Sequence, residues 1–320
     1  MSTRVMRDVF IKALYERMLT DDTIFFLSAD FGAPALDKLR TKFSDRFVNV
    51  GIAEQNLINV ATGLALEGFT VYVYAIAPFL SMRAYEQIRN SAILAQIRGI
   101  NINLISVGAG LSYDVTGPTH HCLEDSCIMT VLPNFIVFSP SDPVLSEKFV
   151  DYSLKQSGPK YIRMDGKAQP ELYTEGHIIS FEDGFTELRK GTDACIISTG
   201  YMTHQAIKVA EKLSLDNIKA GIIDVYFLKP FNEKLLVRYL KKYKHIITME
   251  EAFLNKGGLD TLIENACFSN RVFVGLTKLG FGDRYVFDVG NRANLYKMNE
   301  LDIDNMISKI KTDITSRSKS

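Results

Sequence analysis

Short apolar runs alternate with amphipathic segments along most of the chain. Runs of Ile, Val and Phe with little charge are typical of strands buried on both faces, and they occur at residues 23–30 (TIFFLSAD), 47–53 (FVNVGIA), 68–77 (GFTVYVYAIA), 100–110 (ININLISVGAG), 135–142 (FIVFSPSD) and 160–164 (KYIRM). Between them, apolar residues recur three and four positions apart, which predicts amphipathic helices. The alternation predicts an α/β fold in which helices cover both faces of a parallel sheet.

Two segments show where helices begin. Residues 139–149 (SPSDPVLSEKF) place Ser141 or Asp142 where it can cap a helix that has Pro143 in its first turn. Near the start of the chain, apolar residues recur at helical spacing from Val5 to Met18. We therefore expect an amphipathic first helix there.

The pattern lapses into polar and turn-forming residues around 165–180, and a second alternation follows. It comprises strand candidates at 194–200, 220–230, 245–251 and 271–276, with helix candidates at 202–213 and 257–266. We predict two domains, residues 1–172 with the larger sheet and residues 173–320 with a smaller α/β unit. The closing segment 311–320 (KTDITSRSKS) is expected to be a frayed end.

Composition narrows the possible partners and compartment. The 320 residues carry 37 basic and 37 acidic side chains, so no net field favours nucleic acid or anionic lipid. No apolar run approaches the roughly 18 residues needed to cross a bilayer, and the N-terminal segment lacks the features of a signal peptide. Four cysteines are few for this length and suit a reducing compartment. We expect a cytoplasmic protein that binds neither nucleic acid nor membrane.

Glu54 is an acid in the first turn of an otherwise apolar helix that begins near residue 52. By itself, this position has an ordinary explanation, because a carboxylate near the positive end of a helix dipole contributes a few tenths to ~1 kcal/mol of stability. The motifs around Glu54 favour a functional role as well.

Three segments occur in an order that resembles the pyrimidine-binding half of transketolases: residues 47–56 (FVNVGIAEQN), 78–92 (PFLSMRAYEQIRNSA) and 116–125 (TGPTHHCLED). The resemblance continues through 139–142, 158–164, 223–232 and 250–259, the last two being similar to the C-terminal domain of the family. The family's diphosphate-binding domain, with its Gly-Asp-Gly motif, has no counterpart here. The chain therefore resembles the second subunit of a split transketolase.

The resemblance implies thiamine diphosphate as the cofactor. It makes Glu54 the carboxyl that hydrogen-bonds a ring nitrogen of the aminopyrimidine, and it makes Phe79 the ring on which the pyrimidine stacks. Burial favours the neutral form of Glu54 and the helix N-terminus favours the charged form; we expect burial to prevail in the closed complex. Ile76 and Met82, where many relatives have further aromatics, would supply apolar contact, and Asp30 is a further cofactor-binding candidate. For the apolar positions, core packing is the ordinary alternative.

His120 matches the family histidine that faces the reacting carbon and bonds substrate hydroxyls, a role that suits imidazole near neutral pH. Its neighbour His121 stands where Gln is common. A zinc site built from His120, His121, Cys122 and Cys127 is a less favoured alternative, because this C-x₄-C has no second ligand pair at usable spacing.

The substrate end departs from the family pattern. The two positions at which the family places phosphate ligands, a histidine and an arginine, correspond to Gly108 and Gly166. Losing both cations should weaken phosphate binding, although Lys167 offers a partial replacement. Thr116 replaces an acid that usually reads the stereochemistry of the donor hydroxyl. Gly108, Thr116, Lys167 and His120 are therefore the predicted substrate-binding positions, and an unusual or unphosphorylated sugar is the predicted substrate.

Taken together, the resemblance predicts transfer of a two-carbon ketol unit from a ketose to an aldose. The partner would be a separately encoded subunit carrying the diphosphate-binding domain, in an α₂β₂ assembly. The Mg²⁺ or Ca²⁺ ion would be held mainly by residues of this partner, so no metal ligand is predicted in this chain. Alternatives are a deoxyxylulose-phosphate-synthase-like enzyme, the beta subunit of a 2-oxo acid dehydrogenase, or a non-catalytic scaffold. Arg83, Tyr85, Gln87 and Arg89 are expected on the helix that follows Phe79, at a subunit interface.

Overall fold

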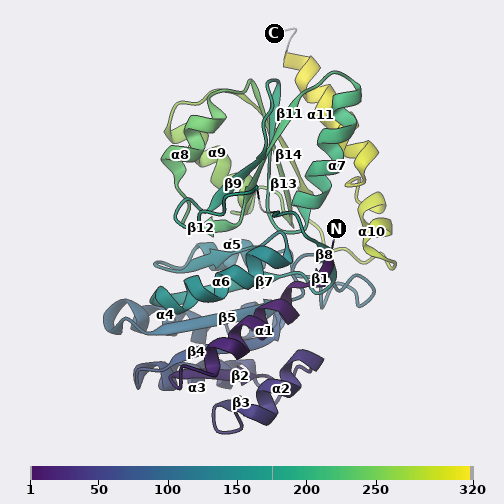
Figure 1. Cartoon of the computed structure of the whole chain (residues 1–320). Helices are drawn as coiled ribbons and strands as arrows, with labels where there is room; N and C mark the ends of the chain where they lie inside the picture. Colours follow the sequence, from purple (N-terminus) through teal and green to yellow (C-terminus); the bar gives the residue numbers. More distant parts are fainter. Residues whose placement is uncertain (1, 175, 318–320) are drawn as a thin grey trace.

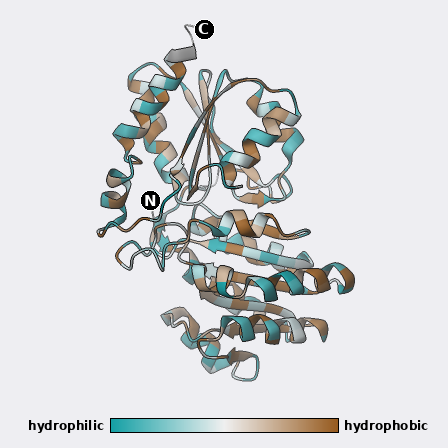
Figure 2. Ribbon diagram, turned by 180° about the vertical axis from the view of Figure 1, so that it is seen from behind, coloured by the Kyte–Doolittle hydropathy of each residue, from teal (hydrophilic) through white to brown (hydrophobic). Residues whose placement is uncertain are grey.

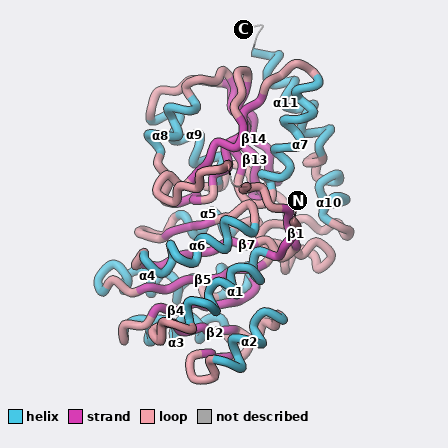
Figure 3. The backbone as a smooth tube through the Cα atoms, viewed as in Figure 1, coloured by secondary structure: helices cyan, strands magenta, loops and turns pink. Residues whose placement is uncertain are grey.

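The computed structural model describes residues 2–174 and 176–317. Two large sheets, each flanked by helices, are stacked one above the other, and the chain runs from the lower sheet to the upper one (Figure 1). Strands lie inside and helices outside in both halves (Figure 3). Brown hydrophobic segments run through the upper strands, and the helices carry both brown and teal residues, as expected of amphipathic helices that cover a sheet (Figure 2).

The seven-stranded sheet carries the candidate site. Its strand order is β12-β6-β7-β5-β4-β2-β3, with β2 at Ile24–Ser28, β3 at Phe47–Asn49, β4 at Thr70–Ile76, β5 at Asn101–Val107, β6 at Ile136–Phe138, β7 at Gly158–Met164 and β12 at Phe227–Lys229. All neighbours are parallel except β12 and β6. A short antiparallel pair joins β1 (Thr3–Val5) to β8 (Ala168–Pro170). Because parallel strands point the same way, their carboxyl ends form one edge, where open α/β sheets bind ligands.

Helices cover both faces of this sheet. On one face lie α1 (Met6–Met18), α2 (Pro34–Lys42) and α6 (Pro143–Lys155), packed through residues such as Phe10 and Phe149. On the other lie α3 (Glu54–Leu66), α4 (Tyr85–Arg98) and the short α5 (Asp125–Thr130). The predicted cap of α6 is present, because the Asp142 carboxylate accepts a 2.9 Å hydrogen bond from the Leu145 backbone N–H.

The second sheet has the order β14-β13-β10-β11-β9. Its strands are β9 (Phe185–Arg189), β10 (Ala194–Ser198), β11 (Ala220–Val225), β13 (His245–Phe253) and β14 (Gly275–Phe281), and only β9 is antiparallel to its neighbour. The helices of this half are α7 (Met202–Leu215), α8 (Glu233–Leu240), α9 (Leu259–Ser269), α10 (Arg292–Met298) and α11 (Ile303–Arg317). The α/β class with two helix-flanked sheets confirms the predicted fold.

Several details differ from the sequence predictions. The segment 220–230 contains two strands, because β12 leaves the second sheet and joins the first. The strand expected at 271–276 is shifted to Gly275–Phe281, where its register with β13 pairs His245 with Gly275. The end expected to fray from residue 311 instead continues α11 to Arg317, since Ile307 and Ile310 anchor the helix on the core; residues 318–320 lie outside the described residues. The domain boundary at 172 stays a prediction.

A buried ionic cluster joins the two halves. The Arg292 guanidinium donates to both Glu251 oxygens, at 2.8 and 2.6 Å, and to Asp165 at 2.6 Å. It also lies over the Tyr201 ring, with Cζ 3.7 Å from the ring centroid. The Arg292 backbone N–H donates to Asp114 at 2.7 Å, at the first residue of α10. The loop after β5 and the end of β7 are therefore tied to the second half by charged contacts.

A buried acid in this region should make stability depend on pH. Burial raises the pKa of Glu250 from 4.5 to about 7, although its carboxyl accepts bonds from the Leu259 and Asp260 N–H groups at the start of α9. The folded chain therefore holds the proton more tightly than the unfolded chain, so this contribution is fully present below pH 4.5 and is lost as pH rises toward 7. Between about pH 4.5 and 7.5, wild type should lose about 1–3 kcal/mol of unfolding free energy relative to Glu250→Gln.

Urea unfolding of both proteins at several pH values measures this difference. The exposed Glu182→Gln is the matched control, for which we expect no change with pH in this window. A constant difference between wild type and Glu250→Gln across the same range would contradict the prediction.

Within residues 2–174 and 176–317, no helix is long and apolar enough to cross a membrane.

Candidate active site

The residues predicted to form the site gather at the carboxyl ends of β2, β3, β4, β5 and β7. They fall into two groups that the structure distinguishes by their contacts. One group surrounds Glu54 and contains the predicted cofactor contacts together with His120. The other contains the remaining predicted substrate positions, which lie in the loop after β5 and directly after β7.

Glu54 is the first residue of α3 and is only 3% exposed. The preceding Gly51 has φ of +76°, a left-handed conformation that lets the chain turn from β3 into the helix. Glu54 receives its partner from a different element, since Arg83 Nη1 lies 2.6 Å from Glu54 Oε2. No sequence pattern indicated this ion pair, because its two residues come from separate elements. The neutral form expected in the closed complex stays a prediction.

Phe79 and Arg83 are the first and last residues of η1, a π-helical turn between β4 and α4. Such turns are frequent at functional sites. The Arg83 guanidinium lies over the Phe79 ring, with Cζ 4.9 Å from its centroid. The same ring meets His120 edge-on, at a centroid distance of 5.2 Å. Glu54, Phe79 and His120, which come from three separate motifs, therefore form one continuous group in space.

His120 is partly exposed, and its Nδ1 lies 3.0 Å from the Thr119 hydroxyl.

Arg83 was expected on the helix after Phe79 at a subunit interface; instead it ends η1, and α4 begins at Tyr85. Tyr85 bonds the Ile128 carbonyl within the chain at 2.8 Å.

The other predicted cofactor contacts border this group. Ile76 is the last residue of β4, and Met82, in η1, is 40% exposed. Asp30 follows β2 with φ of +53° and accepts a 2.8 Å bond from the Asn49 side chain at the end of β3. The Asn49 side-chain oxygen in turn accepts from the Gly51 N–H at 3.0 Å. Asp30 therefore supports the turn that leads to Glu54, a role that sequence reasoning did not assign to it.

Tyr113 fills the space beside the two glycines at the predicted substrate end. Gly108 has φ of +107°, and a Cβ added there would lie 2.2 Å from Tyr113 Cε2. A Cβ added at Gly166 would lie 3.1 Å from Tyr113 Cε1. Burial raises the pKa of the Tyr113 hydroxyl to about 12, although the nearby Arg7 acts in the opposite direction. A neutral aromatic ring therefore occupies the space between positions 108 and 166.

Lys167, the cation expected to compensate, is already paired. Its ammonium contacts the Asp114 carboxylate, which also accepts from the Arg292 N–H. Burial lowers the pKa of His121, which favours a neutral ring. Thr116 is exposed in the same loop. The predicted substrate-binding residues are therefore polar, but the positive charge of Lys167 is already paired with Asp114.

Sequence reasoning missed the roles of Arg83 and Tyr113. The signal for Tyr113 was present in part, because two glycines that replace charged residues leave a volume that some neighbouring side chain must fill. No pattern pointed to Tyr113 rather than to another residue of the loop. The Arg83–Glu54 contact joins residues 29 positions apart across two elements, so only the packing of η1 against α3 brings them together.

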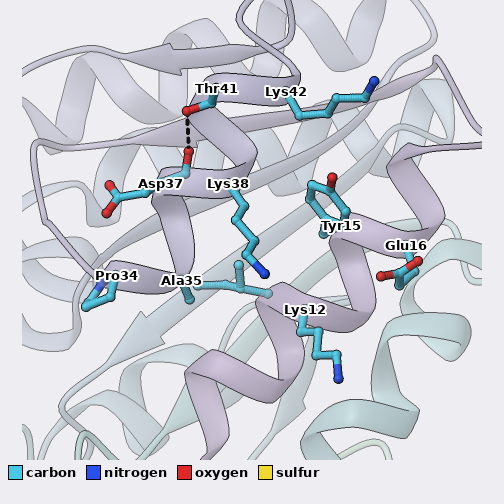
Figure 4. Close-up of a pocket in the computed structure, with 10 residues that line it drawn as sticks. Lys12, Tyr15, Glu16, Pro34, Ala35, Asp37, Lys38, Thr41 and Lys42 are labelled. Carbon is cyan, nitrogen blue, oxygen red and sulfur yellow. Dashed lines mark hydrogen bonds between the residues drawn. The ribbon is translucent and has the colours of Figure 1, made fainter.

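A separate hollow of about 770 Å³ lies between α1 and α2 (Figure 4). Ile11, Tyr15, Lys12 and Lys38 are among the residues that line it. It shares no residue with the predicted site.

Within the described parts of the chain, no group of three or more His, Cys, Asp or Glu side chains is arranged to hold a metal ion. Burial raises the pKa of the Cys122 thiol and raises that of Cys127 to about 11, which favours neutral thiols over metal-binding thiolates.

Two family models together match most of the chain. Residues 2–169 match the pyrimidine-binding domain of transketolase, and residues 185–306 match the transketolase C-terminal domain. The chain belongs to the transketolase family. Its two domains are those that the resemblance in the sequence implied.

Similar proteins include components of split enzymes. The chain is 32% identical to one of the subunits of the apulose-4-phosphate transketolase of Actinobacillus succinogenes, over 83% of this chain and 84% of that protein. It is 30% identical to a 6-deoxy-6-sulfo-D-fructose transketolase subunit of a Clostridium species, over 87% of this chain and 85% of that protein.

A solved split-gene transketolase, an inactive β₄ tetramer, superposes with a TM-score of 0.86. It is 31% identical, and the match covers 98% of this chain and 99% of that one. This transketolase-family chain therefore has the domain content of a split-enzyme beta subunit.

The Glu54 group fits the cofactor that the family uses. A flat heterocycle with a ring nitrogen needs an aromatic face and a hydrogen-bonding carboxyl beside it, and Phe79 and Glu54 supply these within one continuous group. In this structure a planar cation, the Arg83 guanidinium, contacts both residues. The donor chemistry of the site therefore suits an aminopyrimidine.

Proposed function

We propose that this chain is the beta subunit of a thiamine-diphosphate-dependent transketolase that moves a two-carbon ketol unit from a ketose to an aldose. The observation that carries the proposal is the grouping of Glu54, Phe79 and His120, three residues from separate motifs, at the carboxyl edge of the sheet. Phe79 contacts His120 directly, and Arg83 contacts both Phe79 and Glu54. A scaffold subunit without turnover has no need for a buried carboxyl beside an aromatic face and a partly exposed imidazole.

Each residue has a distinct task. Phe79, with Ile76 and Met82 beside it, orients the pyrimidine ring by stacking and apolar contact, which is worth ~0.5–1.5 kcal/mol beyond burial for a ring pair. Glu54 holds a hydrogen at its carboxyl for the ring nitrogen, and Asp30 with Asn49 fixes the turn before it. His120, partly exposed beside Phe79, moves a proton to or from the substrate hydroxyl that it faces. When bound, thiamine diphosphate supplies the carbon that accepts the ketol unit.

The proposal requires a second, separately encoded subunit. The two family domains matched in this chain are the pyrimidine-binding and C-terminal domains, and we propose that the partner binds the diphosphate and its Mg²⁺ or Ca²⁺. Similar proteins are named as subunits of transketolases, which supports a partner of this kind. We propose an α₂β₂ complex in which residues 1–172 provide the cofactor site and residues 173–320 provide packing.

Mixing the chain with its partner, thiamine diphosphate and Mg²⁺ tests the function. We expect turnover with hydroxypyruvate as donor and an aldose as acceptor, and none with either subunit alone. Consumption of pyruvate in place of hydroxypyruvate would instead indicate a deoxyxylulose-phosphate-synthase or 2-oxo acid dehydrogenase reaction. Failure to turn over any ketose with a competent partner would refute the proposal.

The sugar is proposed to be unusual or unphosphorylated. A phosphate is bound by charge-assisted hydrogen bonds, yet Tyr113 fills the space between positions 108 and 166, Lys167 is paired with Asp114, and Arg7 is bonded to Asp8 at 2.7 Å. Similar proteins are named for apulose 4-phosphate and a sulfonated fructose, so sugars outside the common pentose phosphates occur among relatives.

Removing the phosphate from a ketose donor should therefore change kcat/KM by less than about tenfold, because two charge-assisted bonds of ~1.5–3 kcal/mol each are missing. Steady-state kinetics with matched phosphorylated and unphosphorylated donors measure this ratio. Gly166→Arg returns a cation to this position and should raise the preference for the phosphorylated donor, provided that the Tyr113 ring, which would lie 3.1 Å from the new Cβ, moves aside. High kcat/KM on ordinary pentose and tetrose phosphates, with a steep loss on dephosphorylation, would overturn this assignment.

A further inference from the structure

Arg83 is anchored at both sides of its guanidinium although nearly half of its side chain, 47%, is exposed. One side donates to Glu54 Oε2 at 2.6 Å, and the flat face lies 4.9 Å above the Phe79 centroid. A long exposed arginine has many rotamers available, so contacts on two sides indicate that this site selects the conformation. Arg83 covers the same two groups that the proposed function assigns to the pyrimidine ring.

The chemistry of the guanidinium explains this placement. It is planar, positively charged and rich in N–H donors, so it stacks on aromatic rings and pairs with carboxylates. An aminopyrimidine that hydrogen-bonds to a carboxyl presents the same combination of a flat face and a polar edge. The guanidinium and the heterocycle therefore need the same space on Phe79 and the same hydrogen-bonding partner.

We propose that Arg83 occupies the pyrimidine position in the cofactor-free protein and leaves it when the cofactor enters; this inference rests on the proposed function. The π-helical turn places Phe79 and Arg83 at its two ends, so the arginine can return to the ring without rearranging the backbone. Its exposure allows the head group to move into solvent. Arg83 thereby lowers cofactor affinity by competition, without contacting substrate.

The effect of Arg83 on cofactor affinity depends on the fraction of cofactor-free protein in which the arginine has left the site. If the open conformation is about one tenth of the cofactor-free protein, the apparent Kd is raised about tenfold, which corresponds to about 1.4 kcal/mol. An ion pair between a half-exposed arginine and a buried carboxyl, combined with a cation–π contact, accounts for a population ratio of this size. Removing the guanidinium should therefore tighten cofactor binding by about tenfold.

The experiment is a calorimetric titration of thiamine diphosphate with Mg²⁺ into the complex of this chain with its partner, without substrate. We expect Arg83→Ala to bind about tenfold more tightly than wild type. Arg83→Lys, which keeps the charge but loses the planar fork, should give a smaller gain. Arg98→Ala removes an exposed arginine from the end of α4 and should bind like wild type.

The outcomes distinguish this inference from the function on which it rests. Equal or weaker binding by Arg83→Ala, with wild type binding measurably, overturns the inference and leaves the proposed function standing. Absence of binding by every variant overturns both. Circular dichroism and thermal unfolding of Arg83→Ala check that the variant is folded, and because the exposed Arg83 lies outside the core, we expect both to match wild type.

Discussion

Replacing Glu54 with Gln should lower kcat of the assembled enzyme by about 10²- to 10⁴-fold, the usual contribution of a positioned acid–base group. Gln keeps the size of the side chain and can still hydrogen-bond the pyrimidine, but its amide cannot hand over a proton. The buried position of Glu54, 3% exposed, means that water cannot readily substitute for the carboxyl. Steady-state kinetics at saturating cofactor measure the effect on kcat.

Glu67→Gln is the matched control. It makes the same change at the other end of the same helix, where the side chain is exposed, and it should leave kcat unchanged within about twofold. Cofactor affinity of Glu54→Gln should be measured in parallel, because the substitution also removes the ionic partner of Arg83. Near-normal kcat in a folded, cofactor-saturated Glu54→Gln enzyme would show that the carboxyl has no acid–base role.

Arg292→Met should lower the free energy of unfolding by about 3–5 kcal/mol, because removing one partner of a buried ion pair leaves the remaining charges uncompensated. The arginine is 6% exposed and is bonded to Glu251 through two nitrogens and to Asp165 through a third. Leaving those carboxylates buried without a partner costs far more than the intact cluster contributes as a whole. Chemical denaturation in urea measures the loss.

Arg284→Met serves as the control for this change. Arg284 is exposed and its guanidinium bonds the Asn299 side chain at 3.1 Å, so its loss should cost less than about 0.5 kcal/mol. A destabilisation below about 1 kcal/mol for Arg292→Met would mean that the cluster relaxes or admits water.

Local pattern was sufficient for most elements of the fold. Apolar runs predicted the strands of the first sheet, and the Asp142–Pro143 signal predicted the start of α6. These features depend on residues close in sequence, where backbone preference and side-chain period act directly. The pattern failed where an element has two possible partners. The run 220–230 reads as one strand, but its last part joins a different sheet because β6 offers an unpaired edge.

The residues that form the site were predictable, but the ion pairs that they make were not. Motif order placed Glu54, Phe79 and His120 in one site, and the structure groups them: Phe79 contacts His120, and Arg83 links Phe79 to Glu54. The ionic partner of Glu54 was not foreseen, because burial was weighed without knowing that Arg83 would lie beside it. Lys167 was expected to be available to a phosphate, but Asp114 neutralises it. In each case the deciding partner comes from another element.

The sequence by itself determined the α/β class, the family and the residue types that the chemistry needs, because periodicity and ordered motifs are properties of neighbouring positions. Only the tertiary structure decided which charges meet: Arg83 with Glu54, Lys167 with Asp114, and Arg292 with Glu251 and Asp165. The reason is physical. Electrostatic interaction depends on distance and burial, and both are set by how elements far apart in the chain pack together.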